Sequence, residues 1–464
     1  MKTQQHIHFI GICGVAMSAL AVAFHKNGWQ VTGSDKGFYP PISTHLNNAG
    51  ISYYPGWHVD KMTKAGNPDL VIVGNVAGSH NAEWLYVQKQ HLTYMSYPEA
   101  IATYFIKDKS IVCAGTYGKT TTSTLLSWIC TDNKLDPSYM FGGLAWDGFD
   151  SAHIGTGKYC ILEGDEYKTA RWDNRPKFKL YKPTHLLLTA VSWDHADLYP
   201  TEESYSKEFQ DLIHMIPEEG VIVANTDHPG VNNILRTYSS TNILTYGSND
   251  QEYHYHDLTQ TKKGISFTIT HKQKTYHIES AMLGTYMAEN ITGAFAMAHH
   301  IGIDTAAIIR SIKSFCGMKR RLEKRHEGTL TVFDDIAHSP EKAAATLANL
   351  RAVYTGTITA IFEPNTGNRK SASIPQYQKA FTNADEVIIP RLTQVKTNID
   401  ETDPAMDGKQ LKNVIAQSHQ NVHYIEDDNT LIHHITAHKK EGDVIVFLGS
   451  HGFRGMIEET IQQL

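Results

Sequence analysis

The chain has 464 residues, of which 41% are hydrophobic and 19% charged, and its formal net charge is −6. This length exceeds what one hydrophobic core supports, so we expect about two to four domains of ordinary globular composition. The slight acidic excess argues against a protein that binds nucleic acid through general attraction to phosphate.

The five cysteines lie far apart and form no C-x-x-C pair, which is typical of reduced thiols in a cytoplasmic protein. The chain begins with a polar stretch that leads into a strand, and no apolar run approaches the roughly 18 residues of a membrane span. We therefore expect a cytoplasmic protein without membrane insertion. The 26 histidines include no H-E-x-x-H or similar cluster, so we expect most of them at the surface or in loops.

The first predicted domain, residues 1–107, alternates short apolar runs ("HIHFIG", "QVTGSD", "DLVIVGN") with helical stretches, which indicates a parallel α/β unit. Gly11 and Gly14 lie between a strand and the helix expected at 15–27, and Asp35 ends the next strand. The pattern is close to a dinucleotide fingerprint, but its spacing is G-x-x-G rather than G-x-G-x-x-G. A helix start of this kind can hold a nicotinamide dinucleotide or another diphosphate, including that of a nucleotide sugar.

The second predicted domain, residues 108–315, opens with the stretch "CAGTYGKTTTSTLL" between an apolar run and a helical segment. The strict phosphate-loop pattern has a glycine where this chain has Cys113, but the glycine-lysine-threonine turn into a helix is kept. Lys119 would neutralise the β- and γ-phosphates of a nucleoside triphosphate, and the Thr120 hydroxyl would hold magnesium. The predicted nucleotide-binding residues are Gly115, Thr116, Gly118, Lys119, Thr120 and Thr121.

Acidic side chains follow two further strands of this domain. Glu163, Asp165 and Glu166 come at the end of "YCILEGD" and just after it, and Asp194 and His195 follow "THLLLTA". Ligands gather at the carboxyl ends of strands in open α/β sheets, and carboxylates with a histidine suit magnesium. A nicotinamide dehydrogenase would leave this phosphate loop without a role. Two anion sites in consecutive domains therefore favour an enzyme that joins their ligands.

The rest of the chain also has α/β patterns. A β-rich insert near 253–279 contains a predicted hairpin. The third predicted domain, residues 316–464, carries the strands "LTVFDD", "ITAIFEP", "ADEVIIP" and "GDVIVFLGS". The predicted fold class is therefore α/β with three domains.

Six stretches together resemble the Mur ligases, the ATP-dependent amide-forming enzymes of bacterial peptidoglycan synthesis. They span essentially the whole chain in order: "FIGICGVAMSALA", "GTYGKTTT", "EGDEY", "WDHADLYP", "RRLEKR" and "DDIAHSPEKAAATLANLR". The resemblance implies a Rossmann-like N-terminal domain that binds a UDP-sugar, a central phosphate-loop ATPase domain and a C-terminal α/β domain with peptide and nucleotide contacts. It further implies small-molecule substrates, namely UDP-N-acetylmuramate, a short peptide and ATP, with Mg²⁺ as cofactor. The oligomeric state stays open.

Two stretches, "VTGSDKGFYPPISTHLNNAGI" and "GDEYKTARWDNRPKFKLYKP", are most similar to one branch of this family. Members of that branch attach the recycled tripeptide L-alanyl-γ-D-glutamyl-meso-diaminopimelate to UDP-N-acetylmuramate. The nearest sibling adds L-alanine alone to the same nucleotide, and this biosynthetic activity is the alternative function.

The resemblance also implies roles for residues of the central domain. Lys119 and Thr120 match the phosphate-loop lysine and the magnesium hydroxyl. Glu163 matches the magnesium-binding glutamate, with Glu166 as the alternative, and His195 matches a histidine on a second metal ion.

Three matches lie in the third domain. Arg321 matches an arginine that reaches the γ-phosphate when the domains close. Asp335 and His338 match a loop that meets the nucleotide ribose and the substrate. With Lys119 and His195, Arg321 and His338 complete the predicted catalytic set.

Asn290 matches the last asparagine of the family's adenine motif, L-G-x-H-N-x-x-N. This chain reads "LGTYMAEN", with Tyr286 and Met287 in place of histidine and asparagine. Adenine can still stack on Tyr286, whereas the two replaced side chains no longer match the motif that recognises the base.

The remaining predicted contacts are to the two substrates that become joined. Arg369 in "EPNTGNRK" is a candidate clamp for a peptide carboxylate. The candidates for the UDP end are Gly11, Gly14, Ser18, Asp35 and Asn75.

Overall fold

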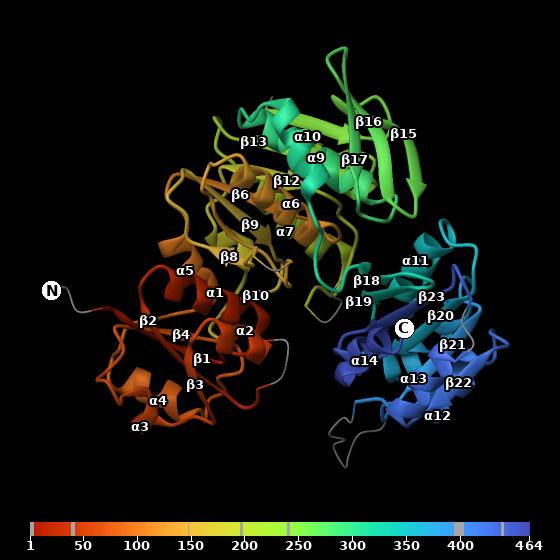
Figure 1. Cartoon of the computed structure of the whole chain (residues 1–464). Helices are drawn as coiled ribbons and strands as arrows, with labels where there is room; N and C mark the ends of the chain where they lie inside the picture. The colour runs from red at the N-terminus through yellow and green to blue at the C-terminus, as the bar shows by residue number, and fades with distance from the viewer. Residues whose placement is uncertain are drawn as a thin grey trace. The chain divides into compact units, whose positions relative to one another are not determined.

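The computed structural model describes residues 4–38, 42–146, 148–194, 198–238, 242–393, 403–437 and 440–464. These residues form three main β-sheets of five, ten and six strands, each flanked by helices (Figure 1). The predicted α/β class is therefore confirmed. His195 lies outside the described residues.

The first sheet is parallel throughout and has the strand order β3-β2-β1-β4-β5. Both faces of β1 are covered by apolar side chains, since Phe9 belongs to one buried cluster and Ile10 to another. The strands are β1 (His6–Ile10), β2 (Gln30–Asp35), β3 (Ser52–Pro55), β4 (Leu70–Val73) and β5 (Tyr94–Met95). The helices are α1 (Val15–Lys26), α2 (Ile42–Asn48), α3 (Val59–Met62), α4 (Ala82–Lys89) and α5 (Tyr97–Tyr104). The helix expected at 15–27 is α1, whereas the short strands β3 and β5 were not predicted.

The second sheet has ten strands in the order β17-β16-β15-β14-β13-β12-β6-β9-β7-β8. Its middle strands run parallel from β14 to β9. The strands are β6 (Lys109–Ala114), β7 (Ser138–Met140), β8 (Ala152–His153), β9 (Tyr159–Gly164), β12 (His185–Leu188), β13 (Val221–Asn225), β14 (Ile243–Gly247), β15 (Tyr253–Thr261), β16 (Gly264–His271) and β17 (Lys274–Ser280). The helices are α6 (Lys119–Asp132), α7 (Glu202–His214), α8 (Pro229–Leu235), α9 (Met287–His300), α10 (Thr305–Ser314) and the 3₁₀ turn η1 (Lys177–Leu180).

The predicted hairpin near 253–279 is present and extends this second sheet. β15 pairs in parallel with β14, with Tyr253 opposite Tyr246. The turn between β16 and β17 is formed by Lys272 and Gln273, whose φ angles of 47° and 66° suit a two-residue hairpin. A separate two-stranded sheet, β10 (Lys168–Ala170) with β11 (Asp173–Pro176), follows β9.

The third sheet has the order β18-β19-β23-β20-β21-β22, and only its edge strand β18 is antiparallel to its neighbour among the described pairs. The strands are β18 (Glu323–Glu327), β19 (Thr331–Asp335), β20 (Ile358–Glu363), β21 (Glu386–Pro390), β22 (Val422–Ile425) and β23 (Val444–Gly449). The helices are α11 (Pro340–Arg351), α12 (Gly408–Ile415), α13 (Asp428–Thr436) and α14 (Met456–Gln462), with 3₁₀ turns η2 (Gly367–Arg369), η3 (Ser371–Tyr377) and η4 (Phe453–Gly455). Separate apolar clusters fill the two faces of this sheet.

The chain divides into two compact units. The first contains the chain up to Leu258, Ser266–Ser280 and Tyr286–Phe315, and the second contains Thr259–Ile265, Ala281–Thr285 and Cys316–Leu464. Because the first unit holds both the five-stranded and the ten-stranded sheet, the domain boundaries at 107 and 315 stay predictions. In the described part of the chain, no helix combines the length and the apolar character needed to cross a bilayer.

Candidate active site

The predicted phosphate loop joins β6 to α6 at the carboxyl edge of the second sheet. Gly115 and Gly118 have φ angles of 139° and 80°, which residues with a Cβ rarely adopt. A Cβ on Gly115 would lie 2.3 Å from the Thr189 Oγ1, and one on Gly118 would lie 2.4 Å from the Asn290 Oδ1. Gly118 caps α6 with no side-chain hydrogen bond to the helix start. The loop is therefore a tight turn that leads into a helix N-terminus without a side-chain cap, which is a favourable position for an anion.

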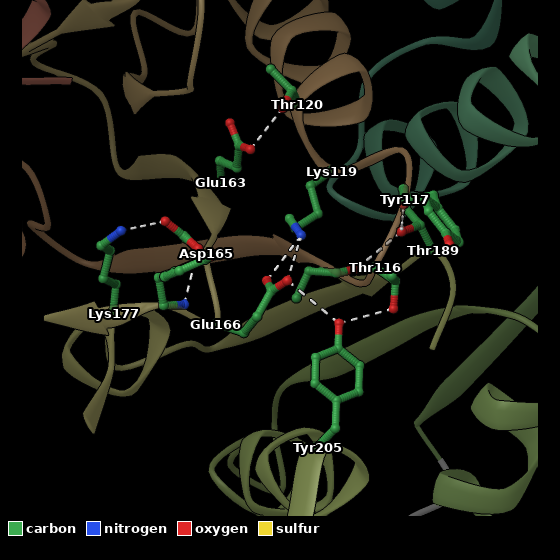
Figure 2. Close-up of polar contacts among 12 residues, drawn as sticks. Thr116, Tyr117, Lys119, Thr120, Glu163, Asp165, Glu166, Lys177, Thr189 and Tyr205 are labelled. Carbon is green, nitrogen blue, oxygen red and sulfur yellow. Dashed lines mark hydrogen bonds and ion pairs between the residues drawn. The ribbon is translucent and has the colours of Figure 1, made fainter. Parts of the chain in front are cut away.

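The Lys119 ammonium points toward the Glu166 carboxylate (Figure 2). Its Nζ lies 2.9 and 3.1 Å from the two carboxylate oxygens of Glu166. The exposed fractions of the two side chains are 14% and 1%, so this ion pair is largely removed from water. Bound phosphate would compete with Glu166 for the lysine charge.

Thr120 and Glu163 place two oxygen ligands side by side (Figure 2). The Thr120 hydroxyl donates a hydrogen bond of 2.7 Å to Glu163 Oε1, and the Gly142 N–H donates to Glu163 Oε2. Hydroxyl and carboxylate oxygens are ligands that Mg²⁺ prefers, so this pair fits the predicted metal. Between the two glutamates, the geometry favours Glu163 as the predicted magnesium ligand, because Glu166 forms an ion pair with Lys119.

Two tyrosines that the sequence did not indicate hold the loop and Glu166. The Tyr205 hydroxyl lies 2.9 Å from the Thr116 hydroxyl and 3.4 Å from Glu166 Oε1, and the Tyr199 hydroxyl donates to the Glu166 carbonyl (2.6 Å). Burial and the nearby carboxylate raise the pKa of Tyr205, which keeps its hydroxyl a neutral donor. In the sequence Tyr205 is an ordinary apolar position of a helix, so no pattern signals this role.

The other acidic candidates differ from each other in their surroundings. Asp165 forms an ion pair with Lys177. Burial alone would raise the pKa of Asp165, but the Lys177 ammonium more than offsets this and holds that pKa below its ordinary value. Asp194 is exposed after β12. Among the predicted nucleotide-binding residues, Thr121 is half-buried in the first turn of α6.

Asn290 lies beside the phosphate loop. Its buried side chain accepts a hydrogen bond of 3.3 Å from the Thr122 hydroxyl, and its Oδ1 is the atom that a Cβ on Gly118 would contact. This position brings α9 against the start of α6. The neighbouring Tyr286 is 43% exposed, as an aromatic side chain that stacks on a base would need to be.

The glycine loop of the first sheet is fixed by Asp35. Its carboxylate accepts hydrogen bonds from the Cys13 N–H (2.8 Å) and the Lys36 N–H (2.7 Å). Gly11 has a φ of 90°, and Gly14 precedes the first residue of α1. The Ser18 hydroxyl is buried and donates to the Val15 carbonyl, so here it supports the helix. Of the predicted UDP contacts, Gly11 and Gly14 lie in the loop before α1, Ser18 lies in the first turns of α1, and Asp35 at the end of β2 holds the loop.

Asn75 lies at the end of β4 and meets a side chain from the β10–β11 hairpin. Arg171 Nε donates to the Asn75 carbonyl at 2.6 Å, and the adjacent Trp172 stacks on Trp84 with ring centroids 5.3 Å apart. The stretch "GDEYKTARWDNRPKF" contains both hairpin residues, but its sequence pattern does not indicate which segment they touch.

Asp335 holds the main chain next to two other predicted third-domain residues, Arg321 and His338. The buried Asp335 carboxylate accepts hydrogen bonds from the Leu322 N–H (2.6 Å) and the Ala337 N–H (2.8 Å). Arg320 is held by Asp334 and by the carbonyls that follow β23, whereas Arg321 is exposed. Asp335 therefore shapes the turn that presents Arg321.

His338 is half-buried, and its Nδ1 lies 2.7 Å from the Ile336 carbonyl. Burial lowers the pKa of His338, so the imidazole is mostly neutral at neutral pH.

Arg369, which we predicted as a carboxylate clamp, makes hydrogen bonds within the protein. Its side chain is buried, Nε donates to the Met406 carbonyl (2.9 Å) and one Nη donates to the Thr393 carbonyl (2.8 Å). A guanidinium that donates to two main-chain carbonyls joins these chain segments. Fewer of its N–H groups then remain for a substrate carboxylate.

Replacing Arg369 with alanine is expected to lower the free energy of unfolding by about 2 kcal/mol, because the buried Met406 carbonyl and the partly buried Thr393 carbonyl lose their donors. Urea unfolding followed by circular dichroism measures this loss. Arg391→Ala is the matched control, since the 55% exposed Arg391 pairs with Asp428 and should contribute under about 1 kcal/mol. Unchanged stability with a raised KM for the peptide alone would restore the clamp role.

Family models match three consecutive parts of the chain. They are described as the Mur ligase family catalytic domain (residues 6–107), the Mur ligase middle domain (residues 113–298) and the Mur ligase glutamate ligase domain (residues 320–451). The middle-domain match contains the phosphate loop, Glu163 and Asn290.

Curated relatives align over almost the full length. The UDP-N-acetylmuramate–L-alanyl-γ-D-glutamyl-meso-2,6-diaminoheptandioate ligase of Haemophilus influenzae is 30% identical over 99% of both chains. The UDP-N-acetylmuramate–L-alanine ligase of Dictyoglomus turgidum is 28% identical over 97% of this chain and 95% of its own.

Solved structures share the fold. A murein peptide ligase from Psychrobacter arcticus superimposes with a TM-score of 0.71 at 27% identity, covering 99% of this chain and 98% of its own. A UDP-N-acetylmuramate–alanine ligase from Thermotoga maritima gives a TM-score of 0.80 at 20% identity over 99% of both chains, which at this identity shows the fold alone.

Proposed function

Because this chain belongs to the Mur ligase family, whose members are ATP-dependent ligases that form amide bonds, we propose that it joins the tripeptide L-alanyl-γ-D-glutamyl-meso-diaminopimelate to UDP-N-acetylmuramate. The observation that carries this assignment is the end-to-end similarity to a ligase named for that tripeptide. Relatives named for L-alanine match over slightly less of the chain and at lower identity, so addition of L-alanine is the competing function. In either case the reaction serves peptidoglycan, by recycling or by synthesis.

The chemistry requires activation of a carboxylate before the amine can react. A lactyl carboxylate oxygen attacks the γ-phosphorus of ATP, ADP leaves, and an acyl phosphate is formed. The amine nitrogen then attacks the acyl carbon, loses a proton, and expels inorganic phosphate. Protein assistance in such a sequence is mainly positioning and stabilisation of charge.

The residues of the central domain fit the first of these steps. The turn from Gly115 to Gly118 directs a helix N-terminus at the phosphates, and Lys119 lies at the first residue of that helix. Thr120 and Glu163 would hold Mg²⁺, which when bound neutralises the phosphate oxygens. Thr116, fixed by Tyr205, keeps the loop in place before the nucleotide arrives.

The other predicted roles belong to this proposal as well. The loop that contains Gly11 and Gly14, held by Asp35 from the end of β2, would take the UDP diphosphate at the start of α1. Arg321 is proposed as a contact of the γ-phosphate, and His338 as a contact of the substrate. A cytoplasmic location is part of the proposal, supported by the free thiols of Cys13, Cys113, Cys130 and Cys160.

An isotope experiment tests this mechanism. With both oxygens of the lactyl carboxylate labelled by ¹⁸O, the released phosphate should contain one labelled oxygen, and the amide product should keep the other. Mass spectrometry of the phosphate measures this transfer. Reactions without the amine or without the UDP-sugar are controls that should release no phosphate. Phosphate that carries no label while the amide accumulates would refute the acyl phosphate.

A further inference from the structure

Two histidines and a glutamate of the second unit converge at a place that the proposed ligase reaction does not use. Glu386 is the first residue of β21, His423 lies in β22, and His434 lies on α13. One ligand atom from each lies within 4.8 Å of the other two. Nε2 of His434 is 2.7 Å and Nε2 of His423 is 3.7 Å from the same Glu386 oxygen, Oε1. Two strands of the third sheet and the helix α13 therefore direct one ligand atom each to the same point.

We propose that Glu386, His423 and His434 form a binding site for a divalent metal ion of the zinc class, with water completing the coordination. Two imidazole nitrogens and one carboxylate oxygen are a known ligand set of Zn²⁺, which leaves its fourth position open to solvent. Mg²⁺ prefers oxygen ligands in octahedral geometry, so this site differs in selectivity from the Thr120–Glu163 pair. The two imidazoles are 44% and 40% exposed, which gives an ion a path from solvent.

Neighbouring groups already orient these ligands. The buried Thr359 hydroxyl donates to Glu386 Oε2 at 3.0 Å, which leaves Oε1 facing the imidazoles. Such hydrogen bonds behind a ligand fix its direction and raise metal affinity. Nε2 of His423 also lies 2.8 Å from Asn421 Oδ1. An entering metal ion would replace this contact and the His434–Glu386 contact with bonds to the same nitrogens.

Occupation of the site has a physical consequence for stability. β22 is the edge strand of its sheet, so a shared ion would tie that edge to α13 and stabilise the folded state.

The test compares metal binding by the full chain and three variants. Zinc sulfate is titrated calorimetrically with magnesium in excess, and Co²⁺ is used separately for its absorption spectrum. His434→Ala and Glu386→Gln each remove a ligand, and His433→Ala removes the exposed neighbour on the same helix as a matched control. We expect the wild type and His433→Ala to bind one more Zn²⁺ than the two ligand variants. Zn²⁺ should raise their Tm, and Co²⁺ should give them an absorption band that the ligand variants lack.

A substitution at Thr359, which holds the Glu386 ligand, gives a second readout in the form of a reduced zinc affinity. Thr359→Val keeps the shape of the side chain but removes the donor to Glu386, so zinc affinity should fall by roughly 10- to 100-fold. The proposal is overturned if His434→Ala and Glu386→Gln bind as many Zn²⁺ ions as His433→Ala with the same affinity. In that case the three side chains are a hydrogen-bonded cluster only.

Discussion

Replacing Lys119 with alanine is expected to lower kcat by about 100- to 1,000-fold, the range for removing one preorganised group that stabilises developing charge. The lysine is the first residue of α6, and its ammonium is the cation of the phosphate loop. In the first step of the proposed reaction, the γ-phosphoryl group is transferred and carries negative charge. The Lys119 ammonium would stabilise this charge. Steady-state release of phosphate at saturating substrate measures the effect.

The same replacement should also destabilise the protein, because the Glu166 carboxylate is 1% exposed and would lose the cation that pairs with it. Breaking a buried ion pair from one side costs about 3 kcal/mol or more. The double variant Lys119→Ala/Glu166→Gln removes the uncompensated charge as well, so its Tm should recover while its turnover stays low. Turnover that recovers together with Tm would mean that Lys119 acts only as a structural partner.

Replacing Glu163 with glutamine is expected to raise the magnesium concentration needed for half-maximal activity by at least about tenfold. Two unit charges about 4 Å apart interact by about 4 kcal/mol at an effective dielectric constant of 20, so the loss of one ligand charge beside a divalent cation is large. Mn²⁺ should restore part of the activity, since it accepts similar ligands. Activity measured across a magnesium series gives the result.

Glu166→Gln is the comparison that decides between the two glutamates. Because Glu166 faces Lys119 rather than Thr120, this variant should keep a magnesium requirement close to that of the wild type. Asp173→Asn, a carboxylate of the β10–β11 hairpin that pairs with Arg175, is a control for the loss of charge elsewhere. A larger magnesium shift in Glu166→Gln than in Glu163→Gln would exchange the two assignments.

The strand-to-helix turns could be predicted because their residues are neighbours in the sequence. Gly115 and Gly118 mark a turn in any chain, and the structure shows the close contacts that require them. Similarly, the polar ends of "YCILEGD" and "THLLLTA" indicated the edge of the sheet where Glu163 lies. Parallel strands β6, β9 and β12 bring these ends together, which the apolar runs predicted.

Pairings between distant segments could not be predicted in this way. Residue pattern alone does not distinguish Glu166, which pairs with Lys119, from Glu163, which contacts Thr120, since both lie at the end of the same strand; only the family resemblance favoured Glu163. The buried position of Arg369 depends on carbonyls more than twenty residues away, so the sequence could not show that its guanidinium joins chain segments; its role as a carboxylate clamp stays a prediction. The convergence of Glu386 with His434 has the same cause, because strand order and helix docking create it.

The measurement that tests the assigned function most directly is kcat/KM for competing amine substrates. UDP-N-acetylmuramate, ATP and Mg²⁺ are held at saturation, and L-alanine, L-alanyl-γ-D-glutamate and the full tripeptide are compared by phosphate release with mass identification of the product. We predict that the tripeptide exceeds L-alanine by roughly 100-fold or more, since a site built for polar groups discriminates strongly against a substrate that lacks them. A higher kcat/KM for L-alanine than for the tripeptide would contradict the recycling function and assign this chain to the biosynthetic step.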